Sequence, residues 1–308
     1  VVRKDEEGFA LLSAVSVLAI LAMLIAGLGL AMRRESDAAR NLRDGAIARA
    51  RIEAAIEIVI EGLLVRNPAE RWPVDGKSRV LRFDGAAIQV TAEDEAGKID
   101  LNWSPVELIR GLLAETGVDS NAQRSIPAEI TRRRQGIRMP GKPPGETTGA
   151  TLLGGPRLRD IGPAPFESDD ALLTLPGMTR AVYRRMRPYV TVYSQSVHVS
   201  VPAASRPVLL AIPGITPHDA DLIIAARAKA TGELVHSVPD DAKRFVDALD
   251  TRVVTITAAA DTASGGHVVR RVVVSLTAKP YQPVQILEWR EDADDEADLS
   301  AIPESGAR

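Results

Sequence analysis

The most constraining feature of this 308-residue chain is an uncharged apolar run that begins at Phe9 and ends at Met32. As an α-helix the run would be about 36 Å long, which is enough to cross a bilayer core of about 30 Å. A helix that is apolar all round must be buried, and a buried helix of this length and uniformity would be unusual in a soluble protein. The run therefore predicts a membrane-spanning helix.

The residues around the run leave three fates open for it. A secretory signal peptide has a shorter apolar core followed by a small-x-small cleavage site, whereas this run continues to Arg33. An uncleaved anchor would keep the whole stretch. In the third case a short charged leader, residues 1–8, would be cut after Gly8, so that the chain would begin at the aromatic Phe9.

Composition excludes several classes of site. The chain has no cysteine, which excludes disulfides, cysteine zinc sites and a thiol nucleophile. Its net charge of −3 is not the basic signature of a nucleic-acid-binding protein. No P-loop, Rossmann, nucleophile-elbow or zinc-protease motif is present, and the four histidines lack a close ligand spacing.

Helical periodicity continues beyond the apolar run. Apolar residues recur at helical spacing from Ala38 to Leu64, and Asn67-Pro68 ends the pattern. We predict one helix over residues 9–66, on the order of 87 Å long. Its N-terminal half would lie in the membrane, and the apolar stripe of its C-terminal half would pack against a sheet.

Strand patterns lie on both sides of a helical block, which predicts an α+β fold. Residues 78–83 and 87–94 alternate around Asp84-Gly85, a pair typical of a two-residue hairpin turn. The segment 97–102 is predicted as a third strand, and VTVYSQSVHVSV as a further extended stretch inside the helical block. Strand patterns return after residue 251, where VRRVVVSLTA predicts a sheet with one covered face. A helical block inserted between the strands of one sheet explains this order.

The predicted domains follow from these patterns, with a Gly- and Pro-rich loop at 136–165 inside the helical block. They are a leader (1–8), the long helix (9–66), an antiparallel sheet (67–102 and 251–290), an inserted helical domain (103–250, with units at about 103–189 and 202–250) and an acidic disordered tail (291–308).

An internal repeat suggests the two units of the helical block. LLTLPGMT at 172–179 recurs as LLAIPGIT at 209–216, and a helical pattern follows each copy. In helix-hairpin-helix and SAM-like units a helix is followed by a Pro-Gly turn and then by a second helix, which is the order seen here. The predicted hairpin turns are Pro176-Gly177 and Pro213-Gly214.

Such turns can bind DNA phosphates through backbone N–H groups, or they can simply pack helices together. In the second copy Asp219 and Asp221 follow the turn, and their carboxylates would repel a phosphate. We favour a packing role, with nucleic acid an unlikely partner, and keep a membrane-anchored DNA-binding receptor as the alternative.

Four polar residues near the end of a predicted strand form a candidate cation site, because carboxylate and amide oxygens bind hard cations. Residues of these types also cap helices and close turns, which is the interpretation we favour. The residues are Asp94, Glu95, Asp100 and Asn102.

Several motifs in a fixed order carry a resemblance to a known family. They are GFALLSAV from Gly8, DEAGKIDLN from Asp94, LPGMTRAVYRRMRPYVTVYS from Leu175 and VLLAIPGIT from Val208. Together they resemble the minor pseudopilin K family of type II secretion. The resemblance implies a pilin fold and a non-enzymatic role.

The resemblance also implies processing at the N-terminus. A prepilin peptidase would cut between Gly8 and Phe9 and methylate Phe9. Most pilin-like subunits carry Glu at the position of Ser13, where a charge in the membrane needs a partner from a neighbouring subunit. A subunit without that Glu suits the end of a fibre. The implied assembly interface is Phe9, Leu11, Leu12 and Ser13.

By the same resemblance, the protein is expected at the tip of the pseudopilus with the minor pseudopilins I and J. There it would initiate or cap assembly for the export of folded proteins across the outer membrane. It would cross the bacterial inner membrane once, with its C-terminal domain in the periplasm. The family's calcium site is also implied, but the region that should hold it, 135–165, is short of acids, so no ligand residues are predicted.

Overall fold

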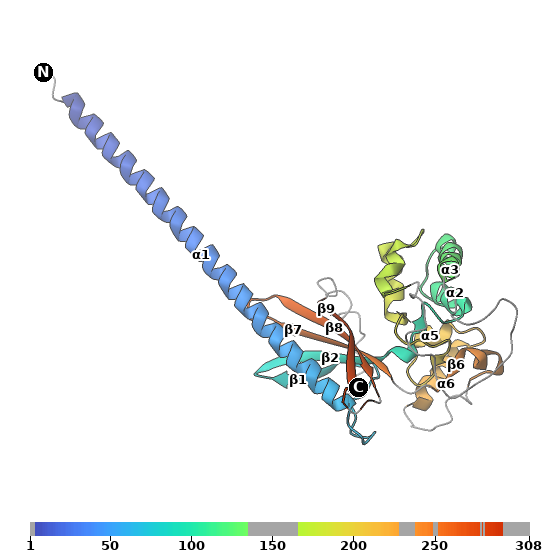
Figure 1. Cartoon of the computed structure of the whole chain (residues 1–308). Coiled ribbons are helices and arrows are strands. Elements are labelled where there is room, and N and C mark those ends of the chain that lie inside the picture. The colour runs from blue at the N-terminus through green and yellow to red at the C-terminus, as the bar shows by residue number, and fades with distance from the viewer. Residues whose placement is uncertain are drawn as a thin grey trace.

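The computed structural model describes residues 4–134, 166–227, 238–248, 252–277, 279 and 281–291. Its dominant element is helix α1, Lys4–Leu63, which runs unbroken for 60 residues. The N-terminal part of α1 projects from the globular body as a stalk, and its C-terminal part packs on a sheet (Figure 1). The predicted α+β fold, with a long N-terminal helix against an antiparallel sheet, is confirmed.

Helix α1 ends three residues before the predicted boundary at residue 66. The N–H of Leu64 donates to the carbonyl of Glu61 at 3.1 Å, a 3₁₀-type bond that closes the last turn. Pro68 disfavours helical geometry at Asn67, so the chain must leave the helix here. The N–H of Trp72 then donates to the carbonyl of Gly62 at 3.0 Å and folds the chain back on the helix end.

The sheet has five strands in the order β1-β2-β7-β8-β9, and every neighbouring pair is antiparallel. Strand β7 lies at its centre, and β1 and β9 form the edges. The strands are β1 (Arg79–Phe83), β2 (Ala86–Asp94), β7 (Val253–Asp261), β8 (His267–Leu276) and β9 (Val284–Glu291).

The hairpin between β1 and β2 forms where the sequence predicts it. Asp84 has φ +49° and Gly85 has φ +75°, so both central residues adopt the left-handed conformation of a two-residue hairpin loop. The Arg51 side chain of α1 donates to Asp84 at 2.8 Å and ties the turn to the long helix.

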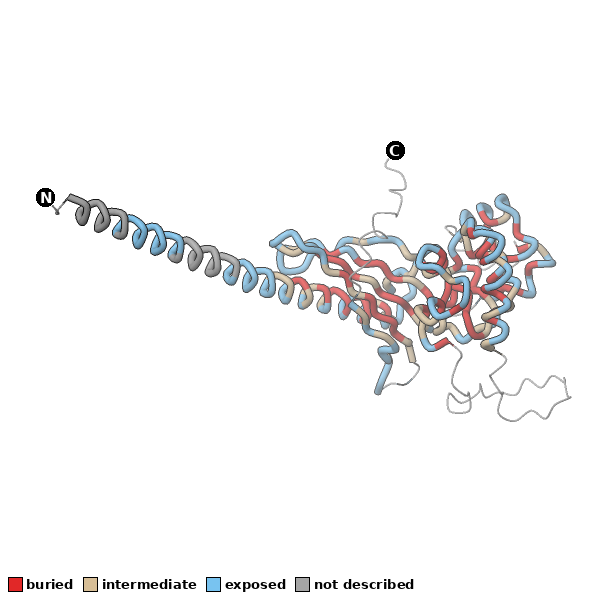
Figure 2. Tube along the Cα trace, turned by 90° about the horizontal axis from the view of Figure 1, so that it is seen from above, coloured by how far each residue is buried: buried red, intermediate tan, exposed pale blue. Residues whose placement is uncertain are grey.

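One face of the sheet packs on the C-terminal half of α1. The apolar core between them includes Ile52 and Ile56 of the helix, Ile256 of β7 and Val272 of β8, all fully buried. Figure 2 shows this buried zone beside the exposed stalk. The prediction of a sheet with one covered face is wrong, because Val273 on the opposite face of β8 is also 0% exposed.

The helical block is inserted between β2 and β7, which are neighbours in the sheet, and lies beyond the sheet from α1 (Figure 1). We call it the helical insert. Its buried apolar side chains form one core of their own. Its helices are α2 (Val106–Glu115), α3 (Ser120–Arg134), η2 (Asp169–Thr174), α4 (Arg180–Met186), η3 (Arg187–Tyr189), α5 (Arg206–Leu210), α6 (Pro217–Arg227) and η5 (Asp240–Phe245).

Two short pairs of parallel strands bracket the two copies of the repeat. Strand β3 (Ile99–Asp100) pairs with β4 (Val190–Thr191), and β5 (Val199–Ser200) pairs with β6 (Val246–Asp247). Each Pro-Gly turn lies in the chain between the two strands of one pair. The division of the insert into two SAM-like units stays a prediction.

Two predicted strands are much shorter than expected. The segment 97–102 contributes only the two residues of β3, and the stretch 190–201 forms only β4 and β5 at its ends. Between β4 and β5 the chain bends at Gln195, whose φ is +52°. The cause is Asp100, whose Oδ2 accepts hydrogen bonds from Ser194 Oγ at 3.0 Å and from the N–H of Gln195 at 2.9 Å.

Some predictions fall outside what the structure describes. These are the loop at 136–165, nearly all of the acidic tail, and the side chains of residues 4–13, 24 and 26–34 within α1. Within the described residues, no helix has an apolar stretch long enough to cross a membrane. The membrane span predicted for Phe9–Met32 includes side chains outside this set and stays a prediction.

Candidate functional site

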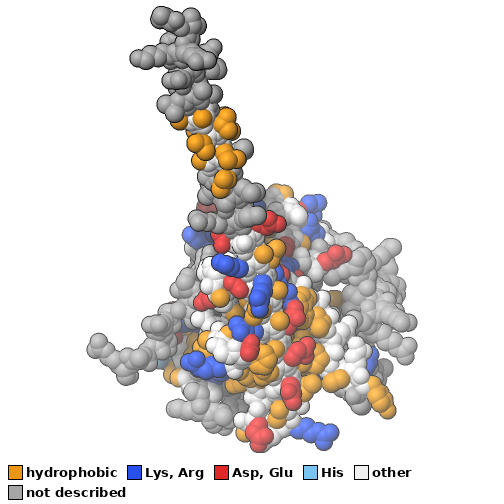
Figure 3. Space-filling model, turned by 90° about the vertical axis from the view of Figure 1, so that its left-hand side faces the viewer, with side chains coloured by type: hydrophobic (Ala, Val, Ile, Leu, Met, Phe, Trp, Pro, Cys, Tyr) orange, Lys and Arg blue, Asp and Glu red, His pale blue; other side chains and the backbone are white. Residues whose placement is uncertain are grey.

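The predicted cleavage and assembly residues lie on one helix. Gly8, Phe9, Leu11, Leu12 and Ser13 all belong to α1, but their side chains are outside the described set. The described part of the stalk that follows them is apolar and exposed (Figure 3). Its large exposed apolar side chains are Val15, Val17, Leu18, Ile20, Leu21, Met23 and Ile25. A contiguous apolar surface of this kind marks a contact with a membrane or with other proteins.

The two predicted Pro-Gly turns face other parts of the insert. Gly177 has φ +84°, and a Cβ added there would lie 2.9 Å from Ser125 Oγ of α3. Gly214 has φ +93°, and its added Cβ would lie 3.4 Å from Cβ of Asp241. Both turns thus combine a left-handed conformation that favours glycine with close packing against the protein.

Carboxylates crowd the start of α6, which follows the second turn. Asp219 accepts hydrogen bonds from the N–H of Thr216 at 2.9 Å and from its hydroxyl at 2.6 Å. Asp221 pairs with Arg206 at 2.9 Å. A nucleic-acid phosphate at this turn would meet negative charge, which argues against the DNA-receptor alternative.

The four polar residues considered for a cation have partners within the protein. Asp94 accepts a hydrogen bond from the N–H of Ala96 at 2.9 Å. Asn102 donates to the carbonyl of Phe166 and accepts from its N–H, both at 3.0 Å. Asp94 therefore caps η1 (Glu95–Gly97), as expected, whereas the side chain of Asn102 has neither a turn nor a cap role and instead ties two distant segments together.

Asp100 is the most heavily bonded of the four. Besides the two bonds to Oδ2 that bend the chain at Gln195, its Oδ1 accepts from the N–H of Asn102 at 2.8 Å and of Trp103 at 3.1 Å. Burial raises the pKa of Asp100, and these donors oppose that shift without cancelling it. The described residues contain no group of three or more His, Cys, Asp or Glu side chains that could hold a metal ion.

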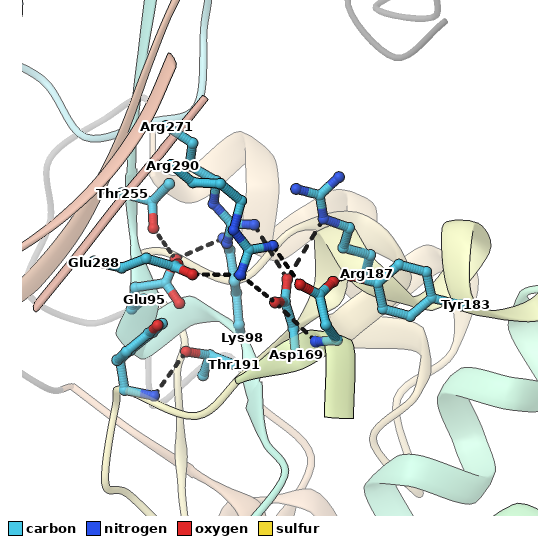
Figure 4. Close-up of polar contacts among 12 residues, drawn as sticks. Glu95, Lys98, Asp169, Tyr183, Arg187, Thr191, Thr255, Arg271, Glu288 and Arg290 are labelled. Carbon is cyan, nitrogen blue, oxygen red and sulfur yellow. Dashed lines mark hydrogen bonds and ion pairs between the residues drawn. The ribbon is translucent and has the colours of Figure 1, made fainter. Parts of the chain in front are cut away.

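A group of charged side chains joins the sheet to the helical insert (Figure 4). We call this group the polar junction. On the sheet side its members come from β8 and β9, and on the insert side they come from η2 and η3. Two further members, Glu95 of η1 (Glu95–Gly97) and the following Lys98, lie where the chain passes from the sheet to the insert. They are Glu95, Lys98, Asp169, Asp170, Arg187, Arg271, Glu288 and Arg290.

Asp169 lies at the centre of the polar junction and faces three arginines from three elements. Its Oδ2 is 3.1 Å from Nη1 of Arg271 and 3.4 Å from Nε of Arg187, and its Oδ1 is 3.8 Å from Nη2 of Arg290. Arg290 also binds Asp170 at 2.7 Å. Burial by itself would raise the pKa of Asp169, but the three guanidinium charges outweigh it and hold the pKa below its usual value.

A second buried ion pair lies where the chain first leaves the sheet. Lys98 Nζ is 2.6 Å from Glu95 Oε1 and 3.0 Å from Glu93 Oε2. Thr255 of β7 donates to the same Glu95 oxygen at 2.6 Å. Burial opposes both charges, but their attraction prevails, so the pKa of Glu95 is lowered and the pKa of Lys98 is raised. Both side chains are therefore charged at neutral pH.

Comparisons with known proteins agree with this architecture. No protein-family model matches the chain. The type II secretion system protein K of Pseudomonas aeruginosa is 26% identical over 248 residues, which are 74% of this chain and 74% of that protein. A solved chain of the GspK-GspI-GspJ complex from enterotoxigenic Escherichia coli matches with a TM-score of 0.51 and 15% identity, and the match covers 85% of this chain and 99% of that one. The chain thus resembles the K-type minor pseudopilins of type II secretion in sequence, and it shares the fold of a chain from that complex. The resemblance seen in the sequence is thereby confirmed.

Sequence reasoning missed the polar junction of this protein. A signal was present in β8, where Arg270 and Arg271 interrupt an otherwise apolar strand. Successive residues of a strand point to opposite faces, so one arginine had to lie on each side of the sheet. Arg270 pairs with Glu53 of α1, and Arg271 pairs with Asp169 of the insert. Two adjacent arginines in a buried strand therefore indicated charged partners on both faces.

Proposed function

We propose that this minor pseudopilin sits at the tip of the type II secretion pseudopilus and helps to initiate or cap its assembly. The size and place of the helical insert are the observation that supports the tip position. It enlarges the globular body on the side of the sheet away from α1 (Figure 1), and so adds bulk to the end of the molecule away from the stalk. A subunit inside a helical shaft has neighbours above and below it, and the insert would obstruct them.

We propose the other minor pseudopilins, of the I and J types, as its partners. The matched solved structure is a GspK-GspI-GspJ complex, which supports the same kind of assembly for this chain. The exposed apolar side chains of the stalk provide the surface through which pilin-like helices can associate. Leu18 and Leu21, which are 64% and 52% exposed, belong to this surface.

We also infer that α1 is processed and anchored as in other pseudopilins. A prepilin peptidase removes residues 1–8, methylates Phe9 and leaves the helix in the inner membrane with the C-terminal domain in the periplasm. Ser13 has no charge to pair with a neighbouring subunit, which is consistent with a position at the end of the fibre. The secretion role follows from assembly and needs no catalytic residue in this chain.

Co-purification tests the partnership. The full chain is expressed with the I- and J-type pseudopilins of the same bacterium and isolated in detergent through a tag on the J-type subunit. We expect this chain and the I-type subunit to elute together with the tagged protein. Elution of this chain alone would contradict the proposal. Its retention on DNA at physiological salt, without either pseudopilin, would instead support the DNA-receptor alternative.

A further inference from the structure

The polar junction connects two parts of the molecule that have separate apolar cores. Among the described residues, one buried cluster lies between α1 and the sheet, and the other lies within the helical insert. The chain crosses between the two parts after β2 and before β7. Polar contacts between parts of a protein resemble transient interfaces, for which relative motion is the ordinary expectation.

The charges at the junction would respond strongly to the loss of one member. The side chain of Asp169 is 7% exposed and that of Arg271 is 10% exposed, so neither is well hydrated. Without the Asp169 carboxylate, Arg271 and Arg187 would remain buried with less compensating charge. Moving the insert away from the sheet would let water reach both guanidinium groups, and neither apolar core would have to open.

Two buried oxygen atoms show that the junction is incompletely satisfied when closed. Glu95 Oε2 and Glu288 Oε2 are buried without a hydrogen bond of good geometry among the residues that the structure describes. Buried polar atoms without a partner cost free energy, which opening of the junction would recover. The ion pairs of Asp169 and Asp170 are the direct contacts between η2 and the strands β8 and β9.

We propose that the polar junction is an ionic latch that sets the orientation of the helical insert relative to the sheet. While Asp169 is charged, Arg271 and Arg290 hold η2 against β8 and β9. When that charge is lost, the insert moves as one body while both apolar cores stay folded. This inference concerns the chain itself and does not depend on its position in a pseudopilus.

Distance measurements between the two parts test the latch. The chain has no cysteine, so a pair introduced as Arg82→Cys on β1 and Leu222→Cys on α6 gives two unique spin-label positions. Both positions are exposed, and they lie on the two parts that the junction joins, one on the sheet and one on the helical insert. The full chain in detergent is compared with Asp169→Asn, and with Asp240→Asn as the control. Asp240 forms an exposed ion pair with Lys243 at 2.6 Å in the same insert.

We expect one narrow distribution of spin-label distances in the starting protein. In Asp169→Asn the distribution should be at least twice as wide, and in Asp240→Asn it should be as narrow as in the starting protein. Amide hydrogen exchange in α2 and in the C-terminal half of α1 should stay slow in all three. Arg290→Gln, which removes one of the two guanidinium charges that the sheet presents to η2, should widen the distribution in the same way. A narrow distribution in both junction variants would overturn the proposal. Loss of amide protection in the insert of Asp169→Asn would also overturn it, because the latch requires that both cores stay folded.

Discussion

At the residue scale, Gly111 shows how one missing side chain allows two helices to pack. It lies inside α2, where glycine usually costs up to about 1 kcal/mol relative to alanine. A Cβ added at Gly111 would lie 2.0 Å from the carbonyl oxygen of Ala211, which follows α5. The backbone of Ala211 cannot move aside for the added Cβ in the way that the end of a flexible side chain can. We expect Gly111→Ala to lower the free energy of unfolding by about 3 kcal/mol, measured by urea denaturation.

Gly45 in α1 provides the matched control for this substitution. It is also a helical glycine, but the nearest atom to its added Cβ is Arg49 Nη1 at 3.5 Å, the end of a flexible side chain. Gly45→Ala should leave the stability unchanged or raise it by up to about 1 kcal/mol. Equal losses in the two variants would show that close packing at Ala211 is not the reason for glycine at position 111.

Asp100 is the second residue for which the structure predicts a large effect. Its carboxylate accepts bonds from Asn102, Trp103, Ser194 and Gln195 in a buried setting. Asp100→Ala leaves these donors without their acceptor, so we expect a loss of about 3 kcal/mol or more in urea denaturation.

The control for Asp100 is Asp119, an exposed carboxylate at the start of α3. It accepts bonds from the N–H groups of Asn121 at 2.9 Å and Ala122 at 3.1 Å. Loss of such a helix cap costs about 1 kcal/mol. If Asp100→Ala were no more destabilising than Asp119→Ala, the bend at Gln195 could not depend on the Asp100 carboxylate.

At the element scale, the features that could be predicted are those that depend on residues close together in the sequence. The Asp84-Gly85 hairpin and the unbroken helix α1 follow from local turn chemistry and from periodicity. The strand predicted over 190–201 failed because a distant carboxylate, Asp100, bends that segment. The polar junction was missed for the same reason, since Asp169 and Arg271 are 102 positions apart in the chain. Single-sequence patterns carry no information on which distant charges meet.

The ion pairs between elements predict a dependence of stability on pH. The folded state lowers the pKa values of Asp169 and Glu95, so their contribution is present above the unfolded values of about 4 and is lost as pH falls through the lower folded values. We therefore expect Asp169→Asn to be less stable than the starting protein at pH 7. The difference should shrink as pH approaches 3.

Urea denaturation of both proteins from pH 7 to pH 3 measures this difference. The raised pKa of Asp100 acts in the opposite direction, because the folded state then binds the proton more readily than the unfolded state. Asp100 is present in both proteins, so its effect cancels in the comparison. A difference that stays constant over this range would mean that the Asp169 charge does not stabilise the junction.

At the scale of the whole molecule, the chain combines an exposed apolar stalk, a sheet packed on the base of that stalk and an insert held by charged contacts. In the proposed function the stalk provides the surface for association, and the insert is the part that a plain pilin fold would lack. This arrangement was predictable in outline from the order of motifs. The orientation of the insert was not, because it depends on contacts between segments far apart in the sequence.

The most direct test of the pseudopilin account is N-terminal mass spectrometry of the protein isolated from native membranes. The account predicts a chain that begins at Phe9, because the peptidase of pseudopilins cuts after Gly8. A chain that keeps residues 1–8 would indicate an ordinary membrane anchor. A chain that begins beyond Met32 would show that the apolar run is a discarded signal peptide, and would contradict assembly through the stalk.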